Sequence, residues 1–166
     1  MLARLFAAQR TRIVDAWVEE VDHSSAPGSD PAARIIRDAA TALYEAVCGQ
    51  ACDPADPDDP HLRIVPAFAA WQAARDKGPV QAAACVYLFK PLLRRHILPQ
   101  AVTADCLQEY LEAESRLDSL ALLVFAEYAR SRERLQTARL DALRREQAAI
   151  RRWASRHGLD ISGEAP

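Results

Sequence analysis

The sequence predicts an all-α fold, a bundle of about five helices whose last helix is very long. Alanine is abundant while valine, isoleucine and threonine are scarce, and this composition favours helices over a sheet. Apolar residues recur at helical spacing in segments that proline- and glycine-containing stretches separate. The stretch from Thr103 to about His157 contains neither proline nor glycine, which predicts a single helix.

The first two helices are predicted over residues 2–22 and from Asp30 to about Cys48. The first segment places apolar side chains on one face and charged side chains between them, as an amphipathic helix does. Asp30-Pro31 is a favourable start, because aspartate accepts backbone N–H bonds and proline tolerates the first helical position. The segment QACDPADPDDP follows, and its prolines and acids predict an exposed connection.

A third helix is predicted from about residue 60 to 75, with Pro66 expected to shorten or kink it. The break Lys77-Gly78-Pro79 leads to a fourth helix over residues 80–98, whose middle is apolar nearly all round and is expected to be central. Pro91 lacks the N–H that would bond to residue 87, so a kink is predicted there.

Thr103 is the expected N-cap of the long fifth helix, and residues 120–125, apolar on every face, are predicted to be deeply buried. After Arg130 the apolar stripe narrows to one or two residues per turn, which is typical of a helix that pairs with another helix at a narrow seam. We therefore predict a bundle over 1–130, an interaction or dimerisation extension over 131–157 and a flexible tail over 158–166. The side chains expected to make the interaction are Leu135, Leu143, Ile150 and Trp153.

Charge is distributed unevenly along the chain. Residues 130–156 carry nine arginines against three acidic residues, while the whole chain has a net charge of −2. Such a helix can be simply solvated, or it can contact phosphates. Because no helix-turn-helix signature or interleaved aromatics accompany the arginines, nucleic-acid binding by this helix stays an alternative that we do not favour. The N-terminus does not resemble a signal peptide and no apolar run is long enough to span a membrane, so we expect a cytoplasmic protein with reduced cysteines.

Three segments resemble a known family, the N-terminal domain of RsbRD-type proteins (RsbT co-antagonists). These segments are RIVDAWVEEV, RDKGPVQAAACVYLFK and ESRLDSLALLVFAEYARSRERLQTARLDALRR. The matching positions are Trp17; Asp76, Pro79, Gln81, Ala82 and Lys90; and Leu117-Asp118, Phe125, Tyr128 and Arg132-Glu133. The serines that flank the family's proline are replaced here by Gly78 and Val80.

The resemblance implies a helical, sensor-like input domain, with a fold related to the non-haem globins of stressosome sensors. In the family, the last helix usually leads into a histidine-kinase or STAS output module. The chain carries no such module after its last helix, so we expect its signal to pass to a partner. The expected partner is a second copy, forming a homodimer, or a separate signalling protein.

Five polar residues near apolar helix centres are candidate site residues: Gln81, Lys90, Glu114, Arg116 and Asp118. A buried charge must be paired, so Lys90 is expected to meet Glu114 or Asp118 in a structural ion pair. The alternative is that these groups line a small polar pocket for a ligand. Both interpretations stay open on the sequence alone.

No catalytic constellation is recognisable, and we predict a non-enzymatic sensor, regulatory or protein-interaction domain without a cofactor. Cys48 and Cys52, with His61 nearby, lack the second pair that a tetrahedral zinc site needs, and a disulfide between them is disfavoured in a reducing compartment. The alternative function is a small-molecule or haem-type binder in the bundle core. His96 would be the haem ligand, although Arg94 and Arg95 indicate a helix end near solvent.

Overall fold

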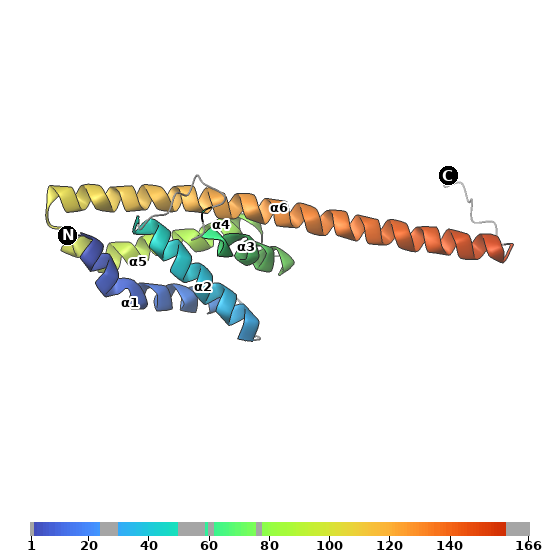
Figure 1. The fold of residues 1–166 in the computed structure, drawn as a ribbon, viewed down its shortest axis with the longest axis horizontal. Helices are drawn as coiled ribbons and strands as arrows, with labels where there is room; N and C mark the ends of the chain where they lie inside the picture. Colours follow the sequence, from blue (N-terminus) through green and yellow to red (C-terminus); the bar gives the residue numbers. More distant parts are fainter. Residues whose placement is uncertain (1, 24–29, 50–58, 60–61, 76–77, 159–166) are drawn as a thin grey trace. The chain divides into compact units, whose positions relative to one another are not determined.

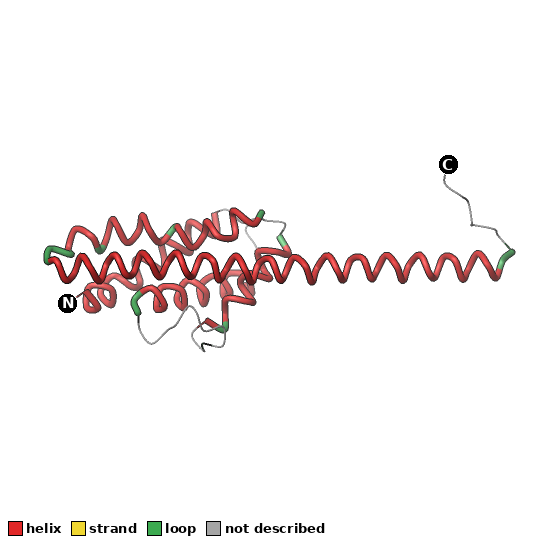
Figure 2. Tube along the Cα trace, turned by 90° about the horizontal axis from the view of Figure 1, so that it is seen from above, coloured by secondary structure: helices red, strands yellow, loops and turns green. Residues whose placement is uncertain are grey.

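The chain folds into helices, as the computed structural model shows (Figures 1 and 2). The structure describes residues 2–23, 30–49, 59, 62–75 and 78–158. These ranges contain helices and turns and no strand, so the predicted all-α fold with a long last helix is confirmed. The elements are α1 (Leu2–His23), α2 (Asp30–Val47), α3 (Ile64–Ala74), α4 (Pro79–Tyr87), α5 (Phe89–His96), the 3₁₀ turn η2 (Leu98–Gln100) and α6 (Ala104–Arg156).

The chain divides into two compact units, Met1–Ser131 and Arg132–Pro166. Helix α6 contributes residues to both units. The contiguous hydrophobic core lies entirely in the first unit. In the second unit most described side chains are exposed. None of the described helices has the length and apolar character of a membrane-spanning segment.

Within the first unit, α1 packs antiparallel to α2, and charged residues of the two helices pair along the edge of the contact. Arg10 forms an ion pair with Glu45, and Arg37 Nη1 lies 2.7 Å from Asp15 Oδ1. Helix α5 likewise runs antiparallel to α6. Lys90 Nζ contacts Asp118 Oδ1 at 2.7 Å, and one turn further along α5 a second cross-helix pair joins it to α6.

Trp17 of α1 lies at the centre of the core and is fully buried. Its ring stacks on Phe89 with centroids 5.2 Å apart, and it also contacts Phe68 at 5.9 Å. The indole Nε1 donates a hydrogen bond of 2.7 Å to the carbonyl of Cys85. This one side chain therefore connects α1 to α3, α4 and α5.

The predicted fourth helix is two helices, α4 and α5, which are interrupted at Leu88. Pro91 cannot donate to the carbonyl of Tyr87, and the chain responds by tightening at Leu88, whose N–H bonds to the Cys85 carbonyl at 3.3 Å. The irregularity predicted at Pro91 thus falls three residues earlier. The expectation that this helix is central is only half right, since Cys85 is buried but Tyr87 is exposed.

The third helix begins at Ile64, later than the predicted start near residue 60. Pro66 therefore lies in its first turn, where backbone N–H groups have no partner within the helix and a missing N–H costs little. The helix is shortened at its start, which was one of the two expected effects of this proline. Pro60 and His61 lie outside the described residues.

Helix α6 begins and ends where its capping residues predict. The Thr103 hydroxyl accepts the N–H of Cys106 at 3.3 Å, which confirms Thr103 as N-cap. Gly158 has a φ of +67° and follows the last turn, in the left-handed conformation that commonly terminates helices. The predicted burial of residues 120–125 on all faces is wrong, because Leu122 is 69% exposed and Phe125 43% exposed. A helix on the outside of a bundle buries only one face, even where its sequence is apolar all round.

Candidate functional site

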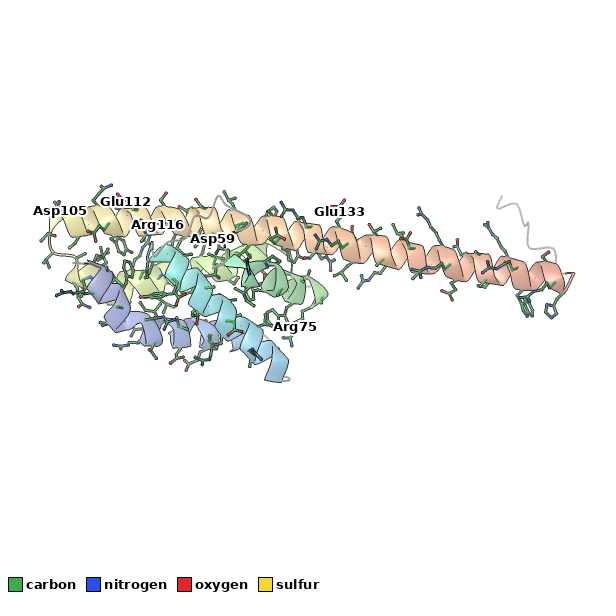
Figure 3. The ribbon with its side chains drawn as sticks, viewed as in Figure 1. Asp59, Arg75, Asp105, Glu112, Arg116 and Glu133 are labelled. Carbon is green, nitrogen blue, oxygen red and sulfur yellow. The ribbon has the colours of Figure 1, made fainter. Side chains whose placement is uncertain are left out.

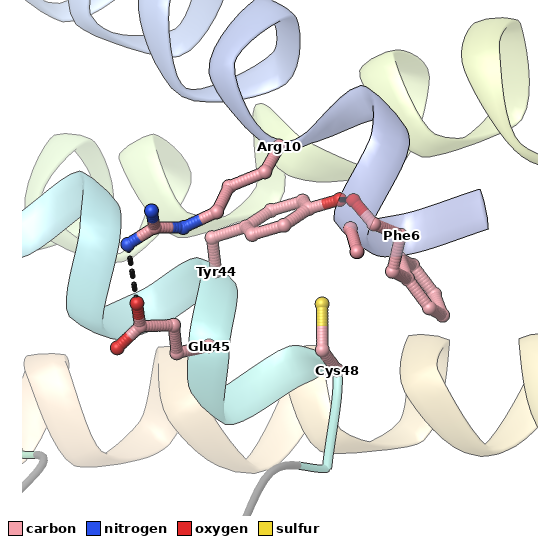
Figure 4. A pocket seen from close by; sticks show the side chains of 6 residues that line it. Phe6, Arg10, Tyr44, Glu45 and Cys48 are labelled. Carbon is pink, nitrogen blue, oxygen red and sulfur yellow. Dashed lines mark hydrogen bonds and ion pairs between the residues drawn. The ribbon is translucent and has the colours of Figure 1, made fainter. Parts of the chain in front are cut away.

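A pocket of about 310 Å³ lies between α1 and α2 (Figure 4). Residues of the first turns of α1 and the last turns of α2 line it: Phe6, Ala7, Arg10, Tyr44, Glu45 and Cys48. The antiparallel packing of the two helices brings these sequence-distant turns together. Sequence reasoning did not predict this pocket, because its residues read separately as parts of two ordinary amphipathic helices.

The polar groups of this pocket already have partners within the protein. Arg10 and Glu45 pair with each other across its edge, as Figure 4 shows. The Tyr44 hydroxyl donates a 2.8 Å hydrogen bond to the carbonyl of Phe6. A ligand that needed a free charge here would have to displace one of these bonds.

The thiol of Cys48 is the most reactive group type in the pocket, but its surroundings suppress its reactivity. Burial raises the pKa of Cys48 to about 12, even though a hydrogen bond with Tyr44 lowers it. Burial also raises the pKa of Tyr44, and Cys48 adds to that effect. Burial therefore disfavours the thiolate that nucleophilic catalysis or metal binding needs. The lining residues offer a small, mostly neutral hollow.

Three of the five sequence-predicted polar residues lie on the facing sides of α5 and α6. Lys90 pairs with Asp118, one of the two partners expected for it. Glu114 instead accepts from Arg94 Nε at 3.0 Å and from the Tyr110 hydroxyl at 2.9 Å. Burial alone would raise the pKa of Glu114, but the hydrogen bonds from Arg94 and Tyr110 outweigh it and lower that pKa. These contacts support the structural interpretation, in which the charges join two helices.

The other two residues serve helix ends. The Gln81 side chain accepts the N–H of Gly78 at 3.1 Å, at the start of α4. Arg116 of α6 (Figure 3) reaches α2 and donates to the carbonyl of Val47 at 2.9 Å. None of the five predicted residues lines the pocket between α1 and α2.

The cysteine and histidine candidates do not come together among the described residues. Cys48, Cys85 and Cys106 are free thiols, whereas Cys52 and His61 lie outside the described part of the chain. The described residues contain no cluster of three or more His, Cys, Asp or Glu side chains that would hold a metal ion. His96 ends α5, where burial and the nearby Arg12 and Arg95 lower its pKa.

The second unit presents an exposed row of side chains, most of them apolar, on α6. Leu140 and Leu143 are each 54% exposed and Ile150 is 53% exposed. Gln147 lies between Leu143 and Ile150, and the four residues follow one another at steps of three and four, which places them on one side of the helix. We call this row the apolar seam; it consists of Leu140, Leu143, Gln147 and Ile150, with Gln147 as its polar member.

The seam contains two of the four residues predicted for an interaction, Leu143 and Ile150. The other two, Leu135 and Trp153, lie beside it, about 80° around the helix from Leu143 at 100° per residue. Leu135 is partly buried and Trp153 is exposed. Leu140 was missed by sequence reasoning, although its spacing of three residues from Leu143 is the signal that would have included it.

Arginines flank the apolar seam on both sides. Arg139 precedes Leu140, on one side, and Arg144 and Arg151 follow Leu143 and Ile150 on the other. Glu146 is the acidic residue in a flanking position. Residues 132–156 as a whole carry eight arginines and three acidic residues, a net formal charge of +5. The seam is thus an apolar row with one polar residue inside it and a basic border.

No family model, curated protein or solved structure matches this chain. The resemblance to RsbRD-type N-terminal domains and the relation to sensor globins therefore stay predictions.

Proposed function

We propose that this chain is a non-enzymatic regulatory protein that binds an α-helix of a different protein along the apolar seam of its second unit. The observation that carries this proposal is the exposure of Leu140, Leu143 and Ile150, each more than half accessible, on one side of a helix. Burying a large apolar side chain is worth about 1.5–3 kcal/mol. Covering these three half-exposed side chains therefore favours association, against the entropic cost of bringing two molecules together.

The pattern of the seam favours a helix as the bound element. Steps of three and four residues are the spacing at which side chains of two helices interdigitate. A single polar residue within such a row, here Gln147, lowers the stability of a helix pair but fixes its register. Gln147 also interrupts the apolar surface, and the charged residues Arg139 and Glu146 lie directly beside the seam. The seam is therefore narrower than the broad apolar face of a helix that inserts into a membrane.

Charge favours a different protein over a second copy, the other expected partner. Two copies of residues 132–156 would each bring a net charge of +5 to the same interface. Like charges brought together reduce both association rate and affinity. The resemblance to RsbRD-type domains supports a regulatory role, in which the first unit is the sensing part and the partner carries the output.

The test uses the full chain as bait in an extract of its source organism, with two matched aspartate substitutions. Leu143→Asp places a charge in the seam, whereas Ala148→Asp places the same charge on the far side of α6, about 140° away. We expect a protein that wild type and Ala148→Asp retain and that Leu143→Asp loses. That protein, once purified, should rebind wild type with an affinity at least ~10-fold higher than it shows for Leu143→Asp.

A third variant separates binding from folding. Leu120→Asp buries an unpaired charge in the first unit, because Leu120 is fully buried, and it should unfold that unit. Leu143→Asp should leave the circular dichroism and unfolding midpoint of the first unit unchanged. The proposal fails if Leu143→Asp also unfolds the first unit, or if it retains the same proteins as Ala148→Asp.

A further inference from the structure

We infer that the helix bound by the apolar seam is acidic and amphipathic, with Asp or Glu residues on both borders of its own apolar row. This inference rests on the proposed function and specifies the chemistry of the partner. It comes from the positions of the arginines relative to the seam, which decide what can face them.

Three arginines border the seam: Arg139 on one side, and Arg144 and Arg151 on the other. We call them the flanking arginines. In paired helices, the residues next to the apolar row lie opposite the bordering residues of the second helix and form interhelical ion pairs. All three flanking arginines are exposed. Arg144 also lies 3.5 Å from Asp141, in a pair whose side chains are both largely accessible, and such exposed pairs contribute little.

A second copy of the chain does not match this border. In a parallel pair, Arg139 would face Arg144 of the other copy, while Glu146 would face Arg151. In an antiparallel pair, the side that carries Arg144 and Arg151 would face itself. Either orientation leaves arginines opposite arginines, which disfavours association. A partner with acidic residues on both borders pairs every flanking arginine.

Three of the other arginines supply a built-in comparison. Arg134, Arg145 and Arg152 lie within about 20° of the direction opposite to Leu143. They contribute to the general positive field of the helix but do not border the seam. Their removal changes the net charge by the same amount as removal of the flanking arginines. The two sets therefore separate specific pairing from general electrostatic attraction.

The experiment uses two synthetic amphipathic peptides of about four heptads, both with leucine in the apolar row and one central glutamine to match Gln147. One carries glutamate on both borders and the other carries lysine. Binding to the full chain is measured by fluorescence anisotropy at low and at high salt. We expect the glutamate peptide to bind at least ~10-fold more tightly than the lysine peptide, and we expect added salt to reduce this preference.

Two triple variants then test where the charge acts. Arg139→Gln/Arg144→Gln/Arg151→Gln should weaken binding of the glutamate peptide about 10-fold, since it removes three facing ion pairs. Arg134→Gln/Arg145→Gln/Arg152→Gln should weaken it less than about 3-fold. If both triple variants weaken binding equally, the flanking arginines are not contact residues and the inference is wrong.

The remaining outcomes separate this inference from the proposed function. Equal binding of the two peptides, lost in Leu143→Asp, would overturn the acidic partner and keep the helix-binding function. If neither peptide binds, both fail. Tighter binding to vesicles with about 30% phosphatidylserine, or to duplex DNA, than to the glutamate peptide would overturn the inference in favour of a membrane or nucleic-acid partner.

Discussion

At the scale of single residues, the backbone conformation of Gly49 allows Arg116 of α6 to contact the end of α2. Gly49 follows the last turn of α2 with a φ of +72°, the left-handed conformation that suits glycine. The Arg116 guanidinium lies against it and donates to the Val47 carbonyl, which the end of the helix leaves without a partner in the helix. A cation at this position also complements the negative end of the helix dipole.

We predict that Gly49→Ala lowers the free energy of unfolding by about 1–2 kcal/mol, the usual cost of a left-handed alanine. The new Cβ would also lie 2.9 Å from Arg116 Nη1 and push the guanidinium away from α2. Urea unfolding followed by tryptophan fluorescence measures the change.

Gly78→Ala is the matched control, because Gly78 has a negative φ of −67° and no atom lies within 4 Å of the position of a Cβ. Its effect should stay below about 1 kcal/mol, because alanine is less favourable than glycine at this N-cap of α4 but needs no left-handed backbone. Equal losses of unfolding free energy in the two variants would show that the left-handed conformation of Gly49 is not the cause of the loss.

For Trp17, the sequence predicts its burial but not its hydrogen bond to Cys85. An aromatic on the apolar face of α1 is predictable as a core residue, and Trp17 is fully buried. The hydrogen bond from its indole to the Cys85 carbonyl is not predictable, because it joins residues of two helices that lie far apart in the sequence. A tertiary hydrogen bond of this kind leaves no trace in the local sequence pattern.

At the scale of elements, α5 and α6 are joined by a short ladder of charges that responds to pH. Glu114 accepts hydrogen bonds from Arg94 and Tyr110, and its pKa is lowered relative to the ordinary 4.5. A carboxyl whose folded-state pKa is lowered stabilises the fold above its ordinary pKa. That contribution disappears as the pH falls through the lower, folded-state pKa.

We therefore predict that wild type loses more stability between pH 5 and pH 3 than Glu114→Gln does, because glutamine has no proton to bind. Urea unfolding at a series of pH values gives both curves. Glu109→Gln, at an exposed position of α6, removes the same charge without touching Arg94 or Tyr110 and should follow wild type. If Glu114→Gln keeps the wild-type slope, the ladder does not contribute to acid sensitivity.

The sequence predicted the two ends of α6 well, but it predicted the effects of prolines on the other helices less well. Thr103 and Gly158 mark the two ends of α6 correctly, because capping depends on the chemistry of one or two residues. Pro66 and Pro91 were recognised as disturbances, but their effects appear at Ile64 and Leu88. A proline excludes certain hydrogen bonds and leaves the choice of where the helix starts or breaks to the surrounding packing.

At the scale of the whole molecule, the apolar pattern differs between the two units. In the first unit, apolar helix faces cover one another, and Leu117, Leu120 and Val124 of α6 are fully buried there. In the second unit, the seam residues remain accessible. The sequence shows a stripe in both parts of α6, but a stripe alone does not say whether another helix of the chain covers it, so the exposure of Leu140 required the structure.

This difference predicts unequal protection from hydrogen exchange along one continuous helix. Short isolated helices are marginal in water, and most helical stability comes from packing of an apolar face. We expect the amides of residues 136–154 to exchange at least ~10-fold faster than those of residues 117–128, measured by mass spectrometry on the free chain. The glutamate peptide should slow exchange in residues 136–154 alone, because it covers the seam.

Protein concentration supplies the control for this prediction. If no second copy covers the seam in the isolated protein, residues 136–154 exchange at the same rate in a dilute sample and in a sample fifty times more concentrated. Protection that rises with concentration would mean that a second copy already covers the seam, and it would contradict the argument from the repulsion of the flanking arginines. Because self-pairing buries the same apolar side chains as a foreign helix, only this dependence on concentration distinguishes the two arrangements in the free protein.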